Sequence, residues 1–329
     1  MTTTNMRAFV RRRYGTPEVL TFETLERPVP VGDEVLVRVH AAGVSIGDHL
    51  VVTGKPYVVR LSPHGGLLRP RRPVPGMALA GRVEAVGEKV TTVRPGDEVF
   101  GDAPAGAFAE YAIVPAGRLA PKPSNLSFEE AAATPWAVTP LQALRDAGAL
   151  RAGQKVLING ASGGVGTWAV QIAKALGADV TAVCSARNVE MVRALGADAV
   201  VDYTKEDFVG GGRRFDLAFD AIGSRSLSDF RKVLQPSGSF VSCSGGSSSW
   251  RWLLGLAEMS LTSLFTGQKL KAFIVSPRRA DLLSLKALVE AGKAKPVIER
   301  RYAFRDAPAA LRHVGERHTR GQVVIQVVA

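Results

Sequence analysis

A glycine-rich turn between an apolar run and a helical pattern is the feature that most constrains the fold. The run 155–159 (KVLIN) suits a buried strand, and the segment Gly160–Gly166 (GASGGVG) follows it directly. From Val165 to Leu176 apolar residues recur at i, i+3, i+4, i+7, i+8 and i+11, which predicts a helix over 164–176 with one buried face. A strand, a tight turn and a helix in this order are typical of a parallel sheet whose strands are joined by helices.

The same alternation continues along the chain. Further strands are predicted at 180–183, 200–201, 215–220, 239–242 and 271–275, and helices at 189–195 and 227–234. We therefore predict an α/β fold in which residues 126–276 form a doubly wound parallel sheet.

The first part of the chain has a different texture. Short alternating runs predict strands at 34–41, 80–86, 98–100 and 108–114, separated by turn signals such as Arg94–Asp97 (RPGD). This spacing indicates a compact, barrel-like β domain over residues 1–125. The tail, with a helix predicted at 282–291 and a strand at 323–328, is expected to return to it, so that 277–329 completes this domain.

The glycine-rich turn also predicts a ligand. Gly163 would let the backbone approach a pyrophosphate, which the amides and dipole of the following helix stabilise. Gly166 would allow helix and strand to pack closely, and Ala161 takes the place of the usual first glycine. The residues expected to hold a dinucleotide here are Ala161, Ser162, Gly163, Gly164, Val165 and Gly166.

The choice of dinucleotide depends on the end of the next strand. Sites specific for NAD place an Asp or Glu there to bind the ribose 2′-OH. This chain has Cys184-Ser185-Ala186-Arg187-Asn188 instead. Ser185 can donate a hydrogen bond and Arg187 can pair with a 2′-phosphate, which predicts NADPH. The alternative for Arg187 is a solvated charge at a helix start.

Composition excludes some classes of protein. The net charge is +12, but the basic residues form short scattered clusters without interleaved aromatics, so nucleic-acid binding is not predicted. Two cysteines in apolar runs and no apolar leader favour a reducing, cytoplasmic setting. The apolar stretch Trp250–Phe265 is interrupted by Arg251 and Glu258, so no integral membrane segment is expected; it could cover a pocket, a subunit interface or a membrane surface.

Several segments together resemble a known family. Gly76–Gly87, Pro95–Val99 (PGDEV), Gly106–Tyr111 (GAFAEY), Gly160–Gly166 and Gly321–Ile325 resemble medium-chain dehydrogenases/reductases, and are most similar to the quinone oxidoreductase (zeta-crystallin-like) branch. The resemblance implies a GroES-like catalytic domain built from both ends of the chain, a Rossmann domain between them, a small-molecule substrate and a homodimer.

The metal ligands of the zinc enzymes in that superfamily are absent. Ser45 stands where they carry cysteine, Met77 stands where they carry histidine, and neither cysteine of this chain lies near Gly101, where a structural zinc lobe would be. We therefore expect a metal-free site.

The resemblance also implies residues around the ligands. Asn188 matches the usual lysine for the 2′-phosphate, which leaves Arg187 as its substitute, and Gln322 replaces a lysine common in the C-terminal piece. The other implied cofactor residues are Thr139, Tyr203, Ile222, Gly223, Ser242 and Cys243.

Catalytic candidates lie on one short segment: Ser45, His49 and Tyr57. Tyr57 or His49 could donate a proton, or a water could. Each has a structural alternative: Ser45 can cap a turn, His49 can serve packing, and Tyr57 can be a pocket wall.

These residues predict an NADPH-dependent, metal-free reductase that transfers hydride to a quinone or an α,β-unsaturated carbonyl compound. An alternative is a zinc-free carbonyl, imine or enoyl-thioester reductase of a biosynthetic pathway. An alternative of another class is an NADPH-binding structural, regulatory or RNA-binding protein.

Overall fold

Two units of the chain each carry their own β-sheet. The structure is a computed structural model that describes residues 5–62, 65–104, 106–243, 255, 258–263 and 265–328. Unit 1 comprises Met1–Trp136, Pro277–Glu290 and Ile298–Ala329, and unit 2 comprises Ala137–Ser276 and Ala291–Val297.

The sheet of unit 2 is parallel throughout, as predicted. Its strand order is β10-β9-β8-β11-β12-β13. The strands are β8 (Lys155–Asn159), β9 (Asp179–Cys184), β10 (Ala199–Asp202), β11 (Phe215–Asp220), β12 (Leu234–Ser242) and β13 (Lys269–Ala272).

Two predicted boundaries in this sheet were wrong. Leu234 pairs with Phe215 and belongs to β12, so the preceding helix ends at Val233. Strand β13 pairs with β12 from Lys269 to Ala272 and stops where β12 ends at Ser242, whereas the apolar run alone suggested 271–275.

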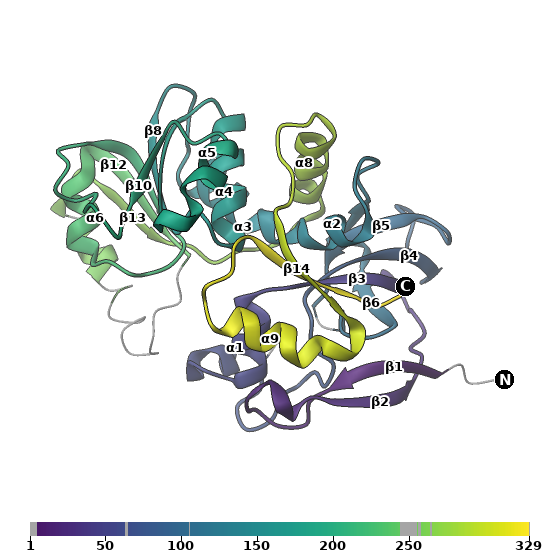
Figure 1. Ribbon diagram of the computed structural model, residues 1–329. Helices are drawn as coiled ribbons and strands as arrows, with labels where there is room; N and C mark the ends of the chain where they lie inside the picture. Colours follow the sequence, from purple (N-terminus) through teal and green to yellow (C-terminus); the bar gives the residue numbers. More distant parts are fainter. Residues whose placement is uncertain are drawn as a thin grey trace. The chain divides into compact units, whose positions relative to one another are not determined.

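Helices cover both faces of this sheet. They are α3 (Val138–Gln142), α4 (Gly164–Ala175), α5 (Val189–Ala194) and α6 (Leu227–Val233), with a π-helical turn at Ala143–Ala147. Figure 1 shows α4 and α5 on one side of the sheet and α6 on the other. The apolar face of α4 is buried, with Trp168, Ile172 and Ala173 each fully enclosed. The predicted doubly wound arrangement is confirmed.

Unit 1 is built around one long strand, β3 (Glu34–Val44). The order of its seven-stranded sheet is β14-β15-β3-β4-β5-β7, and β6 also pairs with β3. The remaining strands are β4 (Ala78–Val86), β5 (Glu98–Asp102), β6 (Tyr111–Pro115), β7 (Leu119–Pro121), β14 (Ile298–Ala303) and β15 (Gln322–Gln326), and β1 (Asn5–Val10) and β2 (Thr21–Glu26) form a separate antiparallel pair. β15 pairs with β3, so the end of the chain completes the sheet begun by its first part.

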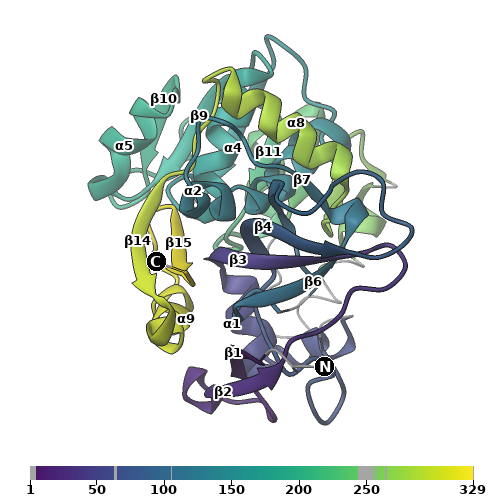
Figure 2. The ribbon, with the colours of Figure 1, turned by 90° about the vertical axis from the view of Figure 1, so that its right-hand side faces the viewer.

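Four helices belong to unit 1: α1 (Ile46–Thr53), α2 (Phe128–Ala133), α8 (Arg279–Glu290) and α9 (Ala307–Gly315). Figure 2 shows α9 beside β14 and β15. Our strand and helix predictions did not include α1, α2, α3, α9, β7, β14 or the β1–β2 pair. Most of these elements are short, but α9 has a clear helical period, since its buried residues are Ala307, Ala310, Leu311 and Val314.

Two segments belong to a different unit from the one that we predicted. We assigned residues 126–136 to the second domain, but α2 packs on β3, and a side chain at Gly43 would lie 2.4 Å from the Ala132 carbonyl oxygen. Residues 291–297 belong to unit 2, where Gln171 bonds the Lys295 backbone in both directions at 2.9 Å.

Much of the Trp250–Phe265 stretch lies outside the described residues, and its three proposed roles stay open. Its described part includes Leu261 and Phe265, which are 59% and 85% exposed. Among the described residues, no helix combines the length and apolar character needed to cross a bilayer.

Candidate nucleotide and catalytic sites

The glycine-rich turn follows β8, the strand at which the strand order of the unit 2 sheet reverses. From β8 the chain moves through β9 to β10, and it then returns to β11 on the other side of β8. The carboxyl ends of parallel strands at such a point are where open α/β sheets bind ligands. The turn after β8 and the residues after β9, β11 and β12 therefore share one edge of the sheet.

Gly166 is required by the protein itself. A Cβ at this position would lie 2.0 Å from the Gly160 carbonyl oxygen and 2.7 Å from the Ala161 backbone. Gly160 has a φ of +83°, and the Ala161 amide donates to the Val183 carbonyl at 3.0 Å. Helix α4 can therefore start this close to β8 only with glycine at 166.

Gly163 is not required by the protein. Its φ is −80°, and the nearest atom to a Cβ added there would be the Gly160 carbonyl oxygen at 3.7 Å. The space beside it is open, and it stands at the N-cap of the twelve-residue helix α4. A bare backbone with free space at a helix N-terminus suits a bound pyrophosphate, so the residues present fit a dinucleotide.

Asn188 is buried, although the resemblance matched it to a lysine that contacts the 2′-phosphate. Its side chain is 4% exposed, and its amide nitrogen donates to Ser162 Oγ at 3.0 Å and to Ser185 Oγ at 3.2 Å. It thus ties the glycine-rich turn to the end of β9. Arg187, next to it, is exposed, and Tyr203 is 57% exposed with its amide bonded to the Cys184 carbonyl at 3.1 Å.

Asp220, which we had not singled out, organises the loop after β11. Its Oδ1 accepts from the Asn159 side chain at 2.9 Å and from the amides of Ile222 and Gly223 at 3.2 and 3.1 Å. Ile222 is 49% exposed at this edge. An aspartate that ends an apolar strand was the available sequence signal.

The remaining predicted cofactor residues lie in different settings. Ser242 is the last residue of β12 and Cys243 follows it, with the Cys243 amide donating to the Asp220 carbonyl at 3.1 Å. Burial raises the pKa of the Cys243 thiol to about 12, so it is held neutral. Thr139 is half-buried in α3. Gln322 is buried at the start of β15 in unit 1, whereas the others belong to unit 2.

The catalytic candidates lie in unit 1, with Ser45 just before α1, His49 on it and Tyr57 just after it. Ser45 caps this helix: its Oγ accepts from the Gly47 amide at 3.1 Å, and Asp48 Oδ2 accepts from the Ser45 amide at 2.9 Å and its hydroxyl at 3.1 Å. Asp48 is 1% exposed. Burial raises the pKa of its carboxyl to about 7, opposed by the bonds from Ser45 and Met77 and assisted by the nearby Asp102.

His49 and Tyr57 have contrasting surroundings. The His49 ring lies against Gly315 of α9, where a Cβ would be 2.4 Å from Cε1, and its Nδ1 contacts the Leu311 carbonyl at 3.0 Å. These contacts favour the packing role for His49. Tyr57 is 64% exposed and lies against the Arg60 guanidinium.

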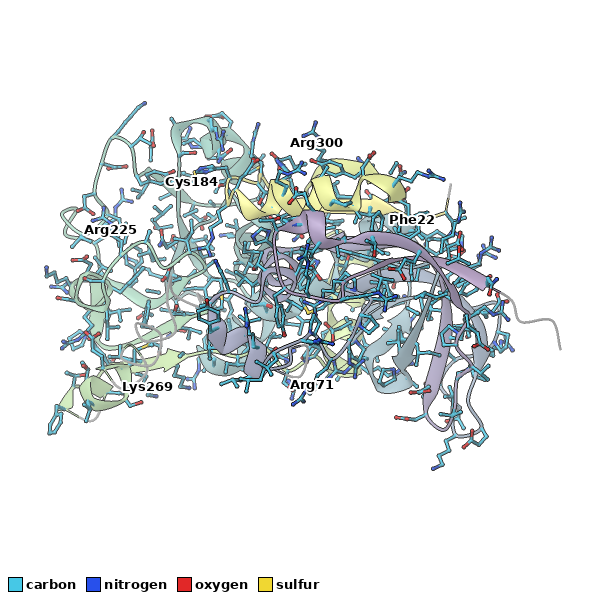
Figure 3. The ribbon with its side chains drawn as sticks, turned by 90° about the horizontal axis from the view of Figure 1, so that it is seen from below. Phe22, Arg71, Cys184, Arg225, Lys269 and Arg300 are labelled. Atoms are coloured by element: carbon cyan, nitrogen blue, oxygen red, sulfur yellow. The ribbon has the colours of Figure 1, made fainter. Side chains whose placement is uncertain are left out.

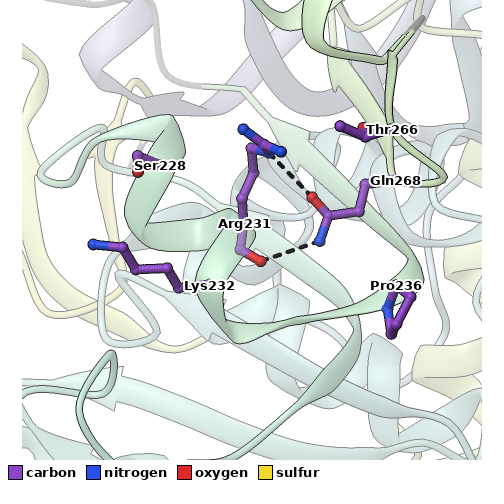
Figure 4. Close-up of a pocket in the computed structure, with 6 residues that line it drawn as sticks. All are labelled: Ser228, Arg231, Lys232, Pro236, Thr266 and Gln268. Atoms are coloured by element: carbon purple, nitrogen blue, oxygen red, sulfur yellow. Dashed lines mark hydrogen bonds between the residues drawn. The ribbon is translucent and has the colours of Figure 1, made fainter.

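Two hollows among the described residues of unit 2 lie near the amino ends of its strands. One is lined by Ser228, Arg231, Lys232, Pro236, Thr266 and Gln268, with Arg231 and Gln268 hydrogen-bonded to each other at 3.2 and 3.1 Å (Figure 4). Pro236 is near the amino end of β12, so this hollow is at the opposite edge of the sheet from the glycine-rich turn. We do not assign it to the dinucleotide.

The labelled basic side chains of each unit are far apart in Figure 3. Arg71 and Arg300 lie on opposite sides of unit 1 in Figure 3, and Arg225 and Lys269 are likewise separated on unit 2. Neither pair forms a basic patch within its own unit. In the part of the chain that the structure describes, no three His, Cys, Asp or Glu side chains are grouped as metal ligands would be.

Comparison with known proteins supports the same architecture. The family model for an alcohol dehydrogenase GroES-like domain matches residues 32–124, and the model described as a zinc-binding dehydrogenase matches residues 195–325. The chain is 33% identical to the mitochondrial NAD(P)H oxidoreductase RTN4IP1 of Danio rerio, covering 99% of this chain and 92% of that protein. It is 31% identical to the chloroplastic NADPH-dependent alkenal/one oxidoreductase of Arabidopsis thaliana, covering 97% and 79%.

A solved structure extends the likeness to three dimensions. The quinone oxidoreductase from Coxiella burnetii matches with a TM-score of 0.84 at 27% identity, covering 99% of this chain and 100% of that one. The predicted GroES-like and Rossmann architecture is confirmed. Because both family models match in order and a relative is 33% identical over almost the whole length, the chain belongs to the medium-chain dehydrogenase/reductase superfamily of nicotinamide-dependent oxidoreductases.

Proposed function

We propose that this protein is an NADPH-dependent reductase that transfers hydride to a quinone or to the β-carbon of an α,β-unsaturated carbonyl compound, at a site without a metal ion. The observation that carries the proposal is the open space at Gly163, beside a Gly166 that the fold itself requires. Relatives named as alkenal/one and quinone oxidoreductases support the choice of acceptor.

The glycine-rich turn has a defined task in this proposal. The bare backbone at Gly163 and the N-terminus of α4 hold the pyrophosphate, and Asn188 fixes the turn by bonding Ser162 and Ser185. Asp220 holds the Ile222 and Gly223 amides in place beside it. When bound, the nicotinamide supplies the hydride.

At the end of β10, next to β9, the Asp202 carboxylate accepts hydrogen bonds from Thr204 and from the Ala186 amide. NADPH is preferred over NADH in this proposal because the residues that follow β9 itself include no carboxylate. Ser185 and the exposed Arg187 lie there, and a guanidinium pairs with a phosphate dianion better than with a hydroxyl. The buried Asn188 does not supply this charge, so the preference rests on Arg187.

The GroES-like unit supplies proton chemistry in this proposal. Without a Lewis acid, negative charge that develops on the substrate oxygen needs a hydrogen-bond donor. Ser45 is half-buried, and its hydroxyl is engaged by Asp48. The exposed phenol of Tyr57 is the better donor, while His49 is held by α9.

We also propose that the protein acts in the cytoplasm as a homodimer. The thiols of Cys184 and Cys243 are both free, which suits a reducing compartment. Light scattering on the full chain, giving twice the monomer mass, would support the dimer, and a single-chain mass would rule it out.

The test of function is NADPH oxidation by the purified full chain. The acceptors are a quinone, a simple enone, an enoyl thioester, an aldehyde and an imine, with NADH in parallel and each reaction repeated after treatment with a strong chelator. We expect chelator-resistant turnover with the quinone or enone and a preference for NADPH. Turnover abolished by the chelator would overturn the metal-free mechanism. Turnover confined to the thioester, aldehyde or imine would replace the proposed acceptor.

A further inference from the structure

Two arginines and two tyrosines of unit 1 alternate in a cation–aromatic ladder, formed by Arg11, Tyr14, Arg60 and Tyr57. The Arg60 guanidinium carbon lies 4.4 Å from the Tyr14 ring centroid and 4.7 Å from that of Tyr57. The Arg11 guanidinium carbon lies 5.6 Å from the Tyr14 centroid. All three separations are within the range of a cation–π contact.

Backbone contacts fix the middle of this ladder. Arg60 Nε donates to the Gly54 carbonyl at 3.1 Å, and the Tyr14 hydroxyl donates to the Gly66 carbonyl at 2.7 Å. Gly54 ends α1 with a φ of +62°, and a Cβ there would lie 2.5 Å from Tyr14 Cδ1 and 2.9 Å from Arg60 Nε. The tyrosine ring and the guanidinium are thus pressed against the end of the helix whose first residue Ser45 caps.

The ladder runs from the core to the surface. Arg11 is 1% exposed, Tyr14 and Arg60 are half-buried, and Tyr57 is 64% exposed. Among the described residues, no carboxylate forms an ion pair with Arg60, so ring faces and carbonyl oxygens surround its charge. An exposed tyrosine side chain otherwise samples several rotamers, and a planar cation against its ring narrows that choice.

We propose that Arg60 is the positioning residue for Tyr57 as proton donor, an inference that rests on the proposed function. When bound, the nicotinamide would supply hydride to the β-carbon of the enone. The O–H bond of Tyr57 would break as a new O–H bond forms on the substrate oxygen, and the resulting enol would tautomerise to the carbonyl product. Water then returns a proton to the phenolate. The Arg60 cation keeps the ring in one orientation and stabilises the phenolate while it exists.

A double-mutant cycle on the full chain tests this role. Tyr57→Phe keeps the ring against Arg60 but removes the hydroxyl, and Arg60→Gln removes the cation. We expect Arg60→Gln to lower kcat for enone reduction by about five- to tenfold while KM for NADPH is unchanged. Arg60→Lys, which keeps the charge, should recover part of this loss. The matched control is Arg12→Gln, an exposed arginine paired with Glu23 in the same unit, which should leave kcat unchanged.

The coupling between Arg60 and Tyr57 in their effects on kcat shows whether Arg60 acts through the Tyr57 hydroxyl. If Arg60 acts through the hydroxyl, Arg60→Gln causes no further loss in the Tyr57→Phe protein. An equal loss in both backgrounds would show a general structural effect and overturn the proposal, as would a Tyr57→Phe protein with unchanged kcat. Should Arg60→Gln fail to fold, Tyr14→Leu removes the other ring against Arg60 and is analysed in the same cycle.

The same assay separates this inference from the proposed function. If the wild-type protein fails to oxidise NADPH with every acceptor tested, both the proposed function and the role of Arg60 are overturned. An active wild-type protein whose cycle shows no coupling overturns the role of Arg60 alone.

Discussion

Asp48 offers the sharpest test of the electrostatics around α1. Burial raises the pKa of its carboxyl from 3.8 to about 7 in the folded protein, and unfolding returns it to the ordinary value. At pH values between about 4 and 7, the folded state therefore keeps a proton on Asp48 that the unfolded state has lost. The resulting stability is complete below about pH 4 and is lost as the pH rises to about 7. We expect Asp48→Asn to remove this pH dependence.

The size of the effect follows from the shift. About three pKa units at about 1.4 kcal/mol each give roughly 4 kcal/mol over the whole range, of which about 2–3 kcal/mol falls between pH 5 and pH 8. Asparagine can still accept from Ser45, so the cap of α1 is kept. Burial also raises the pKa of Asp102, to about 6, against its ion pair with Arg118. The part of this contribution that comes from burial and from Arg118 is common to both proteins and cancels, and only the charge coupling between Asp48 and Asp102 differs in the comparison.

The assay is urea unfolding of the wild-type and Asp48→Asn proteins at pH 5 and pH 8. The wild-type protein should lose about 2–3 kcal/mol more of its unfolding free energy over this interval than the variant. Asp229→Asn serves as the control, because a hydrogen bond from Ser226 lowers the pKa of Asp229 and the group stays ionised over this interval. Equal losses in the wild-type and Asp48→Asn proteins would refute the argument that burial controls this carboxyl.

The remaining predictions concern four positions: the two glycines Gly166 and Gly163, Arg187, and His49. Gly166→Ala should destabilise the protein by about 3 kcal/mol or more in denaturant unfolding, because its Cβ meets the carbonyl of Gly160. Gly163→Ala should change stability by less than about 0.5 kcal/mol in the same assay. It should nevertheless weaken NADPH binding, measured by calorimetry, roughly tenfold or more. Equal destabilisation by the two alanines would contradict this. Arg187→Ala should lower kcat/KM for NADPH by about 10- to 100-fold and leave NADH unaffected, and equal losses would exclude a 2′-phosphate contact. His49→Phe should cost about 1 kcal/mol of unfolding free energy with kcat unchanged, whereas a large fall in kcat would restore His49 as a catalytic candidate.

The sequence alone determined the glycine-rich turn and the parallel sheet around it. Strands 155–159 and 215–220 were predicted to the residue, and α4 to within one residue at its C-terminal end. These features are local: an apolar run fits a strand buried on both faces, a 3.6-residue period fits an amphipathic helix, and glycine alone tolerates the backbone of the turn. The resemblance to the superfamily rested on the glycine-rich turn and on short segments of the other domain, such as Pro95–Val99 and Gly321–Ile325.

Only the tertiary structure decided what surrounds the candidate side chains. The partners of His49 are on α9, 262 residues away in sequence, and no local pattern predicts such a contact. Asn188 is buried because two serines from different turns converge on it, and Asp48 retains a proton near neutral pH because the fold removes it from water. Burial and long-range hydrogen bonds are properties of the packed chain, so the sequence could name these residues as candidates but could not assign their roles.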